Sequence, residues 1–459
     1  MQINDLTVVI LAAGKGTRMR SKSAKVLQSL GAKPIIFHLL DTLKNIPEIS
    51  RSAVIYGFGG DEVKAKISAN FPDTLLIEQK EQLGTANAVA SALKIIPDNG
   101  ATLVLLGDTL LLQKHTIEEI LQAAEKQDLV LLSAILDNPK GYGRIIRENN
   151  SVTRIVEEKD ANSEEKLVKE INTGVMLIDN QALKKNIVKI NNANAQQEYY
   201  LTDIISLIKK NGGNVTAVVA QNTDEALGIN DRIQLAQAEK IYQNRKREEL
   251  MRQGVTLISP EQTYIAGEIT VGVDVIIEPN CTFKGKVTLG DGVFISCGSI
   301  IENAEIGENS KIEPMSIIEN AVIGKNCQIG PFARIRPQST ISDQAKIGNF
   351  VEVKASVIGN ASKVNHLSYI GDSTIGADVN IGAGTITCNY DGANKHRTTI
   401  GDRVFIGSNS ALVAPVAIGD GATIGAGSVI TKNVSAEILA FTRPPLKEVK
   451  DWERPKKNK

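Results

Sequence analysis

The carboxy-terminal half of the chain repeats an aliphatic residue every six positions, and few folds accommodate that period. The clearest runs are Ile323, Ile329, Ile335, Ile341, Ile347 and Val353, and then Ile400, Ile406, Leu412, Ile418, Ile424 and Ile430. An amphipathic helix would place apolar residues three and four positions apart, and a half-buried strand two apart. A coiled solenoid explains the period, because each unit is then a short strand and a corner with one aliphatic directed at the axis. Burying the one aliphatic side chain of a unit contributes roughly 1.5–3 kcal/mol, which is too little to hold the unit alone. The coils must therefore stack to be stable.

The first half of the chain has a different pattern, in which apolar runs alternate with amphipathic stretches, as in a parallel α/β sheet. We expect strands at Thr7–Leu11, Arg51–Tyr56, Thr74–Ile77, Thr102–Leu106 and Leu129–Ile135, and helices at Pro34–Asn45 and Gly84–Ile95. A segment rich in helix formers follows and meets Gly254. The predicted fold class is therefore α/β plus all-β, with an α/β domain over residues 1–230, a linker helix over 231–253 and the repeat domain over 254–459.

One insertion interrupts the repeat. Residues Cys388–Arg397 break the period with the turn-forming sequence Asn389-Tyr390-Asp391-Gly392. A loop extruded from a solenoid corner often carries function, so this segment is a candidate for part of a site. The last residues, Lys456–Lys459, are expected to form a frayed, solvated end.

Composition excludes several classes of function. Lys plus Arg and Asp plus Glu balance at 52 each, which leaves no overall electrostatic footprint for nucleic acid or an anionic membrane. The apolar run Val8–Ala13 is too short for a signal sequence or a membrane span. The four cysteines form no CxxC pair, and four histidines are too few for a multi-histidine metal site. We therefore expect a cytoplasmic protein with buried, reduced thiols that binds neither nucleic acid nor membrane.

A glycine-rich turn follows the first predicted strand. Gly14 and Gly16 would let backbone N–H groups approach a phosphate, and Lys15, Arg18 and Lys25 add positive charge. The sequence is neither a Walker loop nor a complete GxGxxG motif, since Met19 stands where the third glycine belongs. A simple tight turn is the alternative interpretation, and the nearby basic residues favour phosphate.

Asp108 ends the apolar run Leu106-Gly107-Asp108, and Asn230 precedes the linker helix. Open α/β sheets bind ligands at the carboxyl ends of their strands, which is where Asp108 is expected. Each of the two residues could instead be a helix cap or a turn residue. Together they could bind Mg²⁺ through oxygen atoms while a triphosphate supplies the other ligands.

In the repeat half, His366 is the candidate for proton transfer. A lone histidine is more often structural, but Arg336, Lys354, Tyr369 and Asn380 recur about one coil apart and could line one face with it. Arginine and lysine suit a sugar phosphate, and histidine accepts a proton near neutral pH. The arrangement therefore makes His366 a candidate for taking a proton from a bound, negatively charged substrate.

These residues lie in motifs that resemble a known family. LAAGKGTRM (Leu11–Met19), QLGTANA (Gln82–Ala88), GYGRI (Gly141–Ile145), VEEKDA (Val156–Ala161), EINTGV (Glu170–Val175) and GIND (Gly228–Asp231) resemble the sugar-nucleotide pyrophosphorylases. With the hexads, nearly the whole chain resembles bifunctional bacterial enzymes that join an N-acetylglucosamine-1-phosphate uridylyltransferase to a glucosamine-1-phosphate acetyltransferase. The resemblance implies a Rossmann-like nucleotidyltransferase sheet followed by a left-handed parallel β-helix. One departure is Ala24, which replaces the proline that usually precedes Lys25.

The resemblance implies a site in the first half for UTP, N-acetylglucosamine-1-phosphate and Mg²⁺. It assigns phosphate neutralisation to Arg18 and Lys25, and metal binding to Asp108 and Asn230. It assigns the uracil contacts to Gln79, Gly84 and Thr85, and the sugar contacts to Gly143, Glu157 and Asn172. The remaining nucleotide contacts are Leu11, Ala12, Ala13, Gly14, Leu106 and Gly107.

The resemblance also implies a site in the second half for glucosamine-1-phosphate and acetyl-CoA. It makes His366 the general base, with Glu352 as a supporting carboxylate, and gives the sugar phosphate Arg336, Lys354, Tyr369 and Asn380. Acetyl-CoA would contact Ala383, Asn389, Tyr390, Ser408, Ala426 and Arg443, although simple corner packing also explains Ser408 and Ala426. Enzymes of this kind are homotrimers with sites between subunits.

The product implied by the family is UDP-N-acetylglucosamine, a precursor for the bacterial cell envelope, including peptidoglycan and lipopolysaccharide. Two other interpretations remain open. In the first, the solenoid is non-catalytic and serves only trimerisation or regulation. In the second, both enzymes are present but the sugar or base differs, as in a thymidylyltransferase, because such discrimination rests on a few hydrogen bonds. A metal-dependent hexapeptide hydratase is disfavoured by the scarcity of histidines.

Overall fold

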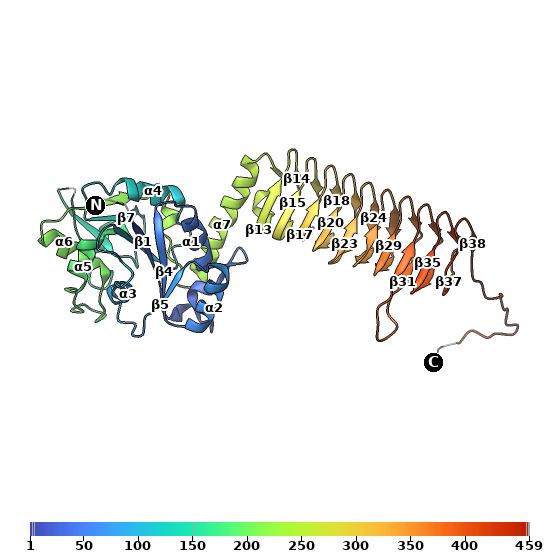
Figure 1. Cartoon of the computed structure of the whole chain (residues 1–459), viewed down its shortest axis with the longest axis horizontal. Helices are drawn as coiled ribbons and strands as arrows, with labels where there is room; N and C mark the ends of the chain where they lie inside the picture. The colour runs from blue at the N-terminus through green and yellow to red at the C-terminus, as the bar shows by residue number, and fades with distance from the viewer. Residues whose placement is uncertain (2, 4, 150, 456, 458–459) are drawn as a thin grey trace. The chain divides into compact units, whose positions relative to one another are not determined.

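The computed structural model describes residues 1, 3, 5–149, 151–455 and 457, so most of the expected tail at 456–459 lies outside the described residues. The chain forms two compact units, residues 1–242 and residues 243–459 (Figure 1). Helix α7 (Arg232–Arg252) runs from the first unit into the second, within one residue at each end of the helix expected over 231–253.

The first unit is a mixed sheet with helices on both faces. Its strand order is β11-β7-β10-β6-β1-β4-β5. The strands are β1 (Leu6–Ala12), β4 (Ile49–Tyr56), β5 (Leu75–Glu78), β6 (Ala101–Leu106), β7 (Leu129–Ile135), β10 (Glu170–Asp179) and β11 (Val215–Val219), and the hairpin β8 (Arg144–Glu148) and β9 (Ser151–Val156) pairs with β10. All five predicted strands are present. The expected parallel sheet needs one correction, since β10 is antiparallel to both β6 and β7.

Alternation along β1 explains the two helical layers. Val8 and Ile10 are buried in one apolar cluster with α1 (Ile35–Lys44), α2 (Gly60–Asn70) and α4 (Lys114–Gln122). Val9 points to the opposite cluster, with α3 (Thr85–Ser91), α5 (Asn180–Ile187) and α6 (Ile204–Lys210). Because successive side chains of a strand leave opposite faces, a strand that is apolar throughout must be covered on both sides.

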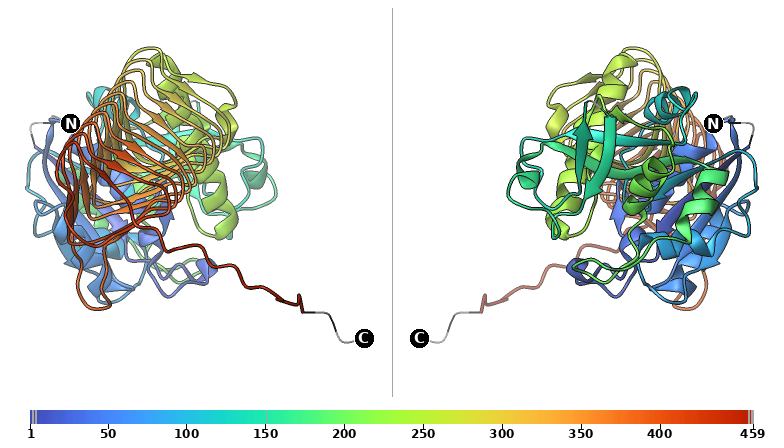
Figure 2. Two further views of the ribbon diagram at one scale, coloured as in Figure 1. Left: turned by 90° about the vertical axis from the view of Figure 1, so that its right-hand side faces the viewer. Right: turned by 90° about the vertical axis from the view of Figure 1, so that its left-hand side faces the viewer.

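The second unit is a left-handed parallel β-helix whose coils follow one another along the chain (Figure 2). One face is an eleven-stranded sheet that runs from β12 (Thr256–Leu257) to β38 (Leu439–Ala440), and the other faces form a sixteen-stranded sheet. The strands that carry the candidate site are β22 (Arg334–Ile335), β24 (Lys346–Asn349), β25 (Glu352–Lys354), β27 (Lys363–His366), β28 (Tyr369–Gly371), β30 (Asn380–Ile381) and β31 (Ile386–Cys388).

The aliphatic residue of each hexad is the core of this unit. Ile335 pairs with Val353, which pairs with Ile370 on the next coil, and all three are fully buried. They belong to one continuous cluster that runs from Leu250 to Ile430. Stacking one aliphatic on the next therefore gives the isolated hexads the shared core that the sequence period predicts.

One corner of the β-helix carries exposed apolar side chains, although the corner residues have the positive φ angles of the left-handed backbone region. The residues of this corner ladder are Met315, Phe332, Phe350 and Leu367, with φ between 48° and 58° and exposures of 51–62%. The rings of Phe332 and Phe350 are stacked with centroids 5.2 Å apart. Asparagine or glycine tolerates a left-handed corner better than phenylalanine, so packing alone does not account for these residues.

Candidate active sites

A cavity of about 540 Å³ opens at the carboxyl ends of β1 and β6 in the first unit. Its size is in the range of small-molecule sites, and its position is where parallel sheets bind ligands. The residues expected in the nucleotide and sugar site that line it are Leu11, Arg18, Thr85, Leu106, Asp108, Gly143, Glu157, Asn172 and Asn230. They come from distant segments of the chain, so the fold brings them together.

The side-chain oxygens of Asp108 and Asn230 both contact the ammonium group of Lys25. The ammonium group of Lys25 forms an ion pair with Asp108 and donates a hydrogen bond to Asn230 Oδ1 at 3.3 Å. A carboxylate and an amide oxygen are ligands that Mg²⁺ accepts, and the ion keeps its other positions for water and phosphate. Among the described residues there is no group of three or more His, Cys, Asp or Glu side chains that could hold a metal.

The helix-cap interpretation of Asn230 is wrong for the start of α7. Asp231 Oδ1 instead accepts the backbone N–H groups of Ile233 and Gln234, both at 2.9 Å. Asn230 is therefore not required for capping, and its side chain contacts Lys25.

The glycine-rich turn positions Lys25. Gly16 has a φ of 56°, and a Cβ there would lie 2.7 Å from the Cβ of Lys25, so only glycine lets the two segments approach. A Cβ on Gly14 would meet nothing within 4 Å, which leaves the space beside it open. Ala24 is 1% exposed and has a φ of −56° and a ψ of 145°, a conformation that proline also adopts. The departure at Ala24 thus keeps the backbone of Lys25 in place.

The opposite end of the cavity is suited to a sugar. Thr202 donates a hydrogen bond to Glu157 at 3.2 Å, and burial raises the pKa of the Glu157 carboxyl. Gly143 lies beside this carboxylate, and its carbonyl accepts the backbone N–H of Asn172 at 2.9 Å. A partly buried carboxylate with free lone pairs is an acceptor for hydroxyl groups.

An ion pair joins two of the sequence motifs at this end. Arg144 of GYGRI is 1% exposed and pairs with Glu158 of VEEKDA at 2.7 Å. Glu158 also accepts the backbone N–H of Gly141 at 3.1 Å. The pair thereby holds the Gly141–Gly143 turn against the cavity.

Of the three residues expected to contact uracil, Thr85 lines the cavity and Gln79 and Gly84 do not. The amide nitrogen of Gln79 is engaged by Asn87 at 2.7 Å and by the Gly84 carbonyl at 3.3 Å. Thr85 accepts the backbone N–H of Leu201 at 2.9 Å and is the member of this group that lines the cavity. Ala12, Ala13, Gly14, Lys25, Gln79, Gly84 and Gly107 are not among the lining residues.

Sequence reasoning missed several lining residues. Lys140 and Tyr142 flank the GYGRI glycine and could have been found from that motif. Thr202 and Gln234 carry no motif, and only the folded chain brings them to the cavity.

In the second unit, the expected sugar-phosphate residues are divided between two faces. Arg336 follows β22, and Lys354 and Tyr369 lie on the paired strands β25 and β28 of the sixteen-stranded sheet. Asn380 lies on β30 and His366 at the end of β27, both in the eleven-stranded sheet. The expectation of a single face is therefore wrong for Asn380 and His366, because a coil turns a corner between these strands and those of Arg336, Lys354 and Tyr369.

The partners of Glu352 and His366 also differ from expectation. Glu352 pairs with Arg336 at 2.6 Å and does not pair with the imidazole. The side-chain partner that the structure gives His366 is Asn349, at 2.7 Å from Nδ1.

The inserted loop folds back onto this site. Asn389 donates hydrogen bonds to the hydroxyl of Tyr369 at 3.4 Å and to the carboxylate of Asp372. Lys395, which sequence reasoning missed, lies beside Lys354, and that ammonium lowers the pKa of Lys395. Two adjacent ammonium groups repel each other until an anion joins them, so the pair suits a phosphate. The position of Lys395 inside the insertion was the available signal.

The expected acetyl-CoA residues begin one coil beyond His366. Registers along the eleven-stranded sheet stack Ile381, Ile406 and Ile424, and Ala383, Ser408 and Ala426 each follow two positions later. These small side chains form a column on successive coils. Tyr390 is 61% exposed on the inserted loop, and Arg443 is exposed near the carboxyl terminus with its guanidinium 5.9 Å from the ring of Phe441.

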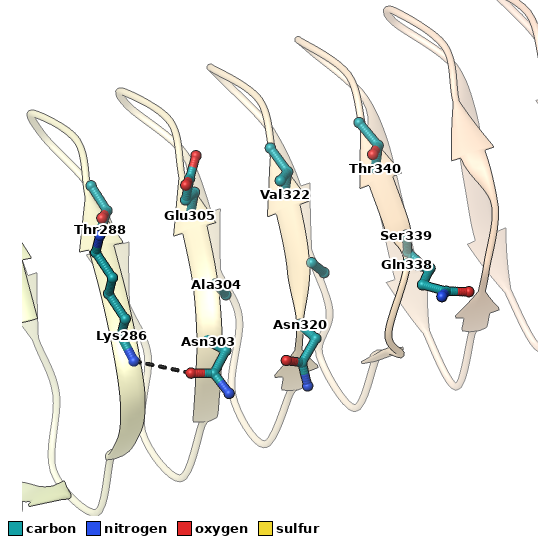
Figure 3. A pocket seen from close by; sticks show the side chains of 11 residues that line it. Lys286, Thr288, Asn303, Ala304, Glu305, Asn320, Val322, Gln338, Ser339 and Thr340 are labelled. Carbon is teal, nitrogen blue, oxygen red and sulfur yellow. Dashed lines mark hydrogen bonds between the residues drawn. The ribbon is translucent and has the colours of Figure 1, made fainter. Parts of the chain in front are cut away.

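A further hollow of about 490 Å³ lies on another face of the β-helix (Figure 3). Lys286, Asn303, Asn320 and Gln338 are among the residues that line it, and Lys286 donates its backbone N–H to Asn303 at 3.1 Å. None of the residues singled out from the sequence lies there.

Comparison with known proteins identifies the family. Residues 8–144 match the MobA-like NTP transferase domain, 265–339 the GMPPB C-terminal domain, and 397–432 the hexapeptide repeat of succinyl-transferase. The curated relative "Bifunctional protein GlmU" of Dichelobacter nodosus is 51% identical over 98% of this chain and 97% of that protein. Proteins of the same name from Acinetobacter baumannii (strain AYE) and a Psychrobacter species are 46% and 48% identical, each over 99% of this chain and 99–100% of their own length.

None of the helices in the described part of the chain has the length and apolar character of a membrane span. The NTP transferase match lies in the first unit, the other two matches lie in the second, and the relatives cover both units. The chain therefore belongs to the GlmU family of bifunctional enzymes, with a nucleotidyltransferase half followed by a hexapeptide-repeat acetyltransferase half.

Proposed function

We propose that the chain makes UDP-N-acetylglucosamine in two steps at the two sites described above. Residues 254–459 transfer the acetyl group of acetyl-CoA to the amine of glucosamine-1-phosphate. Residues 1–230 then transfer the uridylyl group of UTP to N-acetylglucosamine-1-phosphate, and residues 231–253 link the two domains. The observation that carries the proposal is that each unit gathers its own set of charged residues, around Asp108 in one and around Lys354 in the other.

Acetyl transfer requires a neutral amine and a base. Arg336, Lys354 and Lys395 supply the charge that holds the sugar phosphate. The amine nitrogen attacks the thioester carbonyl, His366 Nε2 accepts the proton, the C–S bond breaks, and the proton leaves with the thiol of CoA. Ala383, Ser408 and Ala426 leave room for the pantetheine arm, Asn389 and Tyr390 contact the donor from the loop, and Arg443 binds a CoA phosphate. Tyr369 and Asn380 position the sugar.

Uridylyl transfer requires no protein nucleophile, because the sugar phosphate oxygen is already charged. That oxygen attacks the α-phosphorus of UTP, and pyrophosphate leaves. Arg18 and Lys25 neutralise the phosphates, while Glu157, Asn172 and Gly143 orient the sugar. Mg²⁺, held by Asp108 and Asn230, would supply further charge neutralisation when bound. Lys25 contacts both of these residues, so the same cluster would hold the ion and the lysine that neutralises phosphate charge.

We further propose that the chain acts as a homotrimer in the cytoplasm, a setting that suits its four free thiols. The corner ladder of Met315, Phe332, Phe350 and Leu367 supports assembly, because it exposes contiguous apolar surface beside His366.

A two-step assay with the purified full chain tests the function. Glucosamine-1-phosphate, acetyl-CoA, UTP and Mg²⁺ are supplied together, and free CoA, pyrophosphate and UDP-N-acetylglucosamine are measured. All three should accumulate in equal amounts at the end of the reaction. Pyrophosphate release from N-acetylglucosamine-1-phosphate without any release of CoA from glucosamine-1-phosphate would instead indicate a single transferase with a non-catalytic β-helix.

A further inference from the structure

Asn349 and His366 occupy equivalent places on successive coils. Strands β24 and β27 pair in parallel with Asn349 opposite His366. The backbone N–H of Leu367 donates to the carbonyl of Asn349 at 3.1 Å, which fixes the two segments against each other at the corner. The close stacking leaves no room for a side chain at Gly348, where a Cβ would lie 1.9 Å from the carbonyl oxygen of Asn365. The side chains of Asn349 and His366 are therefore held side by side by the ladder.

The contact between them determines which ring nitrogen carries the proton. Asn349 Oδ1 lies 2.7 Å from His366 Nδ1. A carboxamide oxygen accepts hydrogen bonds and never donates them, so Nδ1 must be the donor. A neutral imidazole with its proton on Nδ1 has its lone pair on Nε2. This is the tautomer that can take a proton from an attacking amine.

The contact also limits rotation of the ring. The backbone carbonyl of His366 is anchored by the hydroxyl of Ser368 at 2.8 Å. The imidazole is exposed, and the torsion that turns it is broad in energy. The hydrogen bond to Asn349 removes that freedom. On the coil after His366 the matching position is Ala383, which carries no polar side-chain atom, so that position offers the imidazole no such partner.

We propose that Asn349 is a positioning residue for acetyl transfer, which holds His366 in the Nδ1-protonated tautomer and aims Nε2 at the substrate amine. When Nε2 accepts the proton, the Nδ1–H···Oδ1 bond is kept and becomes charge-assisted, which stabilises the imidazolium. The proposal rests on the proposed role of His366 as the base.

The test uses the full-length protein and two substitutions of Asn349. Asn349→Leu removes the acceptor, and Asn349→Asp restores it with a negative charge. We expect Asn349→Leu to lower kcat of acetyl transfer on the order of 10- to 100-fold with little change in KM. Asn349→Asp should recover most of that loss. It should also move the acidic limb of the kcat profile to higher pH, because a carboxylate stabilises the protonated ring more than an amide does.

Uridylyl transfer by the same preparations reports folding, and Gln328→Leu is the matched control. Gln328 is an exposed amide on the same sheet, bonded to Glu313 at 3.1 Å, and its loss should leave both activities unchanged. Wild-type kcat in Asn349→Leu would overturn the proposal. If Asn349→Leu loses both activities, the variant is misfolded and the Asp variant decides. An unshifted pH profile of kcat for acetyl transfer in Asn349→Asp would then overturn the proposal.

His366→Ala separates the two levels of the argument. Wild-type acetylation in His366→Ala would remove the proposed base itself. Loss of acetylation in His366→Ala together with full activity in Asn349→Leu would refute the positioning role alone.

Discussion

At the scale of single residues, the site in the first unit was predictable as a set of residue types but not as a set of contacts. The motifs name Asp108, Asn230 and Lys25, and the structure joins them in one cluster. The sequence could not show that Asp231 caps α7 and frees Asn230. In the second unit it could not show that Glu352 pairs with Arg336 while His366 pairs with Asn349. Which side chains pair depends on the geometry of the turns and corners, and residue spacing does not show that geometry.

Asp108→Ala should reduce kcat/KM of uridylyl transfer by about 100-fold or more, because it removes both a proposed metal ligand and the partner of Lys25. Acetyl transfer by the same protein should be unchanged. Both rates are measured on one preparation, with Asp137→Ala, an exposed carboxylate outside the cavity, as the control. Equal loss of both activities would contradict two independent sites.

Glu157 should make sugar binding sensitive to pH. Burial raises the pKa of this carboxyl above its usual 4.5, so protonation begins at a higher pH than for an exposed glutamate. As the pH falls through that raised pKa, the carboxylate acceptor is lost and KM for N-acetylglucosamine-1-phosphate should rise. Glu157→Gln should start with a higher KM and lack this part of the pH dependence. An equally steep rise in the Gln variant would assign the effect to the substrate phosphate.

At the scale of elements, the period of six predicted the coils because each hexad must bury its own aliphatic. The expectation of a parallel sheet in the first unit was wrong at β10, which was not among the predicted strands and runs antiparallel to β6 and β7. Spacing by one coil also placed Asn380 and His366 on the face of Lys354 and Tyr369, because such spacing fixes the coil and not the position around it. Local patterns thus predicted the elements, and pairing over long distances determined the rest.

Ile335→Ala tests the coil core. Ile335 is fully buried between Ile318 and Val353, and the substitution leaves a cavity in the column. We expect a loss of about 2–5 kcal/mol in the free energy of unfolding of the β-helix, measured by denaturant titration. Thr340→Ala, an exposed change on β23 (Ser339–Ile341), should stay within about 0.5 kcal/mol. A similar small effect for both would argue against a shared core.

At the scale of the whole molecule, each of the two units has its own apolar core and its own candidate site. Each apolar cluster lies within one unit, and the continuous column from Leu250 to Ile430 belongs to the second alone. The sequence predicted this division because its two halves have different periods. The assembly of several chains is harder to infer, since it depends on surface that a single fold leaves exposed. The corner ladder is such a surface.

Phe332→Asn together with Phe350→Asn should dissociate the proposed trimer. Both phenylalanines are more than half exposed and stacked at left-handed corners, where asparagine is tolerated better. The double variant should therefore keep or gain stability as a single chain while its molecular mass, measured by light scattering after size exclusion, falls to that of a monomer. Acetyl transfer should fall with it, and uridylyl transfer should persist. Val322→Asn, an exposed apolar residue in the hollow of Figure 3, is the control and should leave the mass unchanged. A double variant that keeps both its mass and its acetyl transfer would show that the ladder is not an interface, because the loss of two stacked rings from its centre should remove much of the apolar area that holds the copies together.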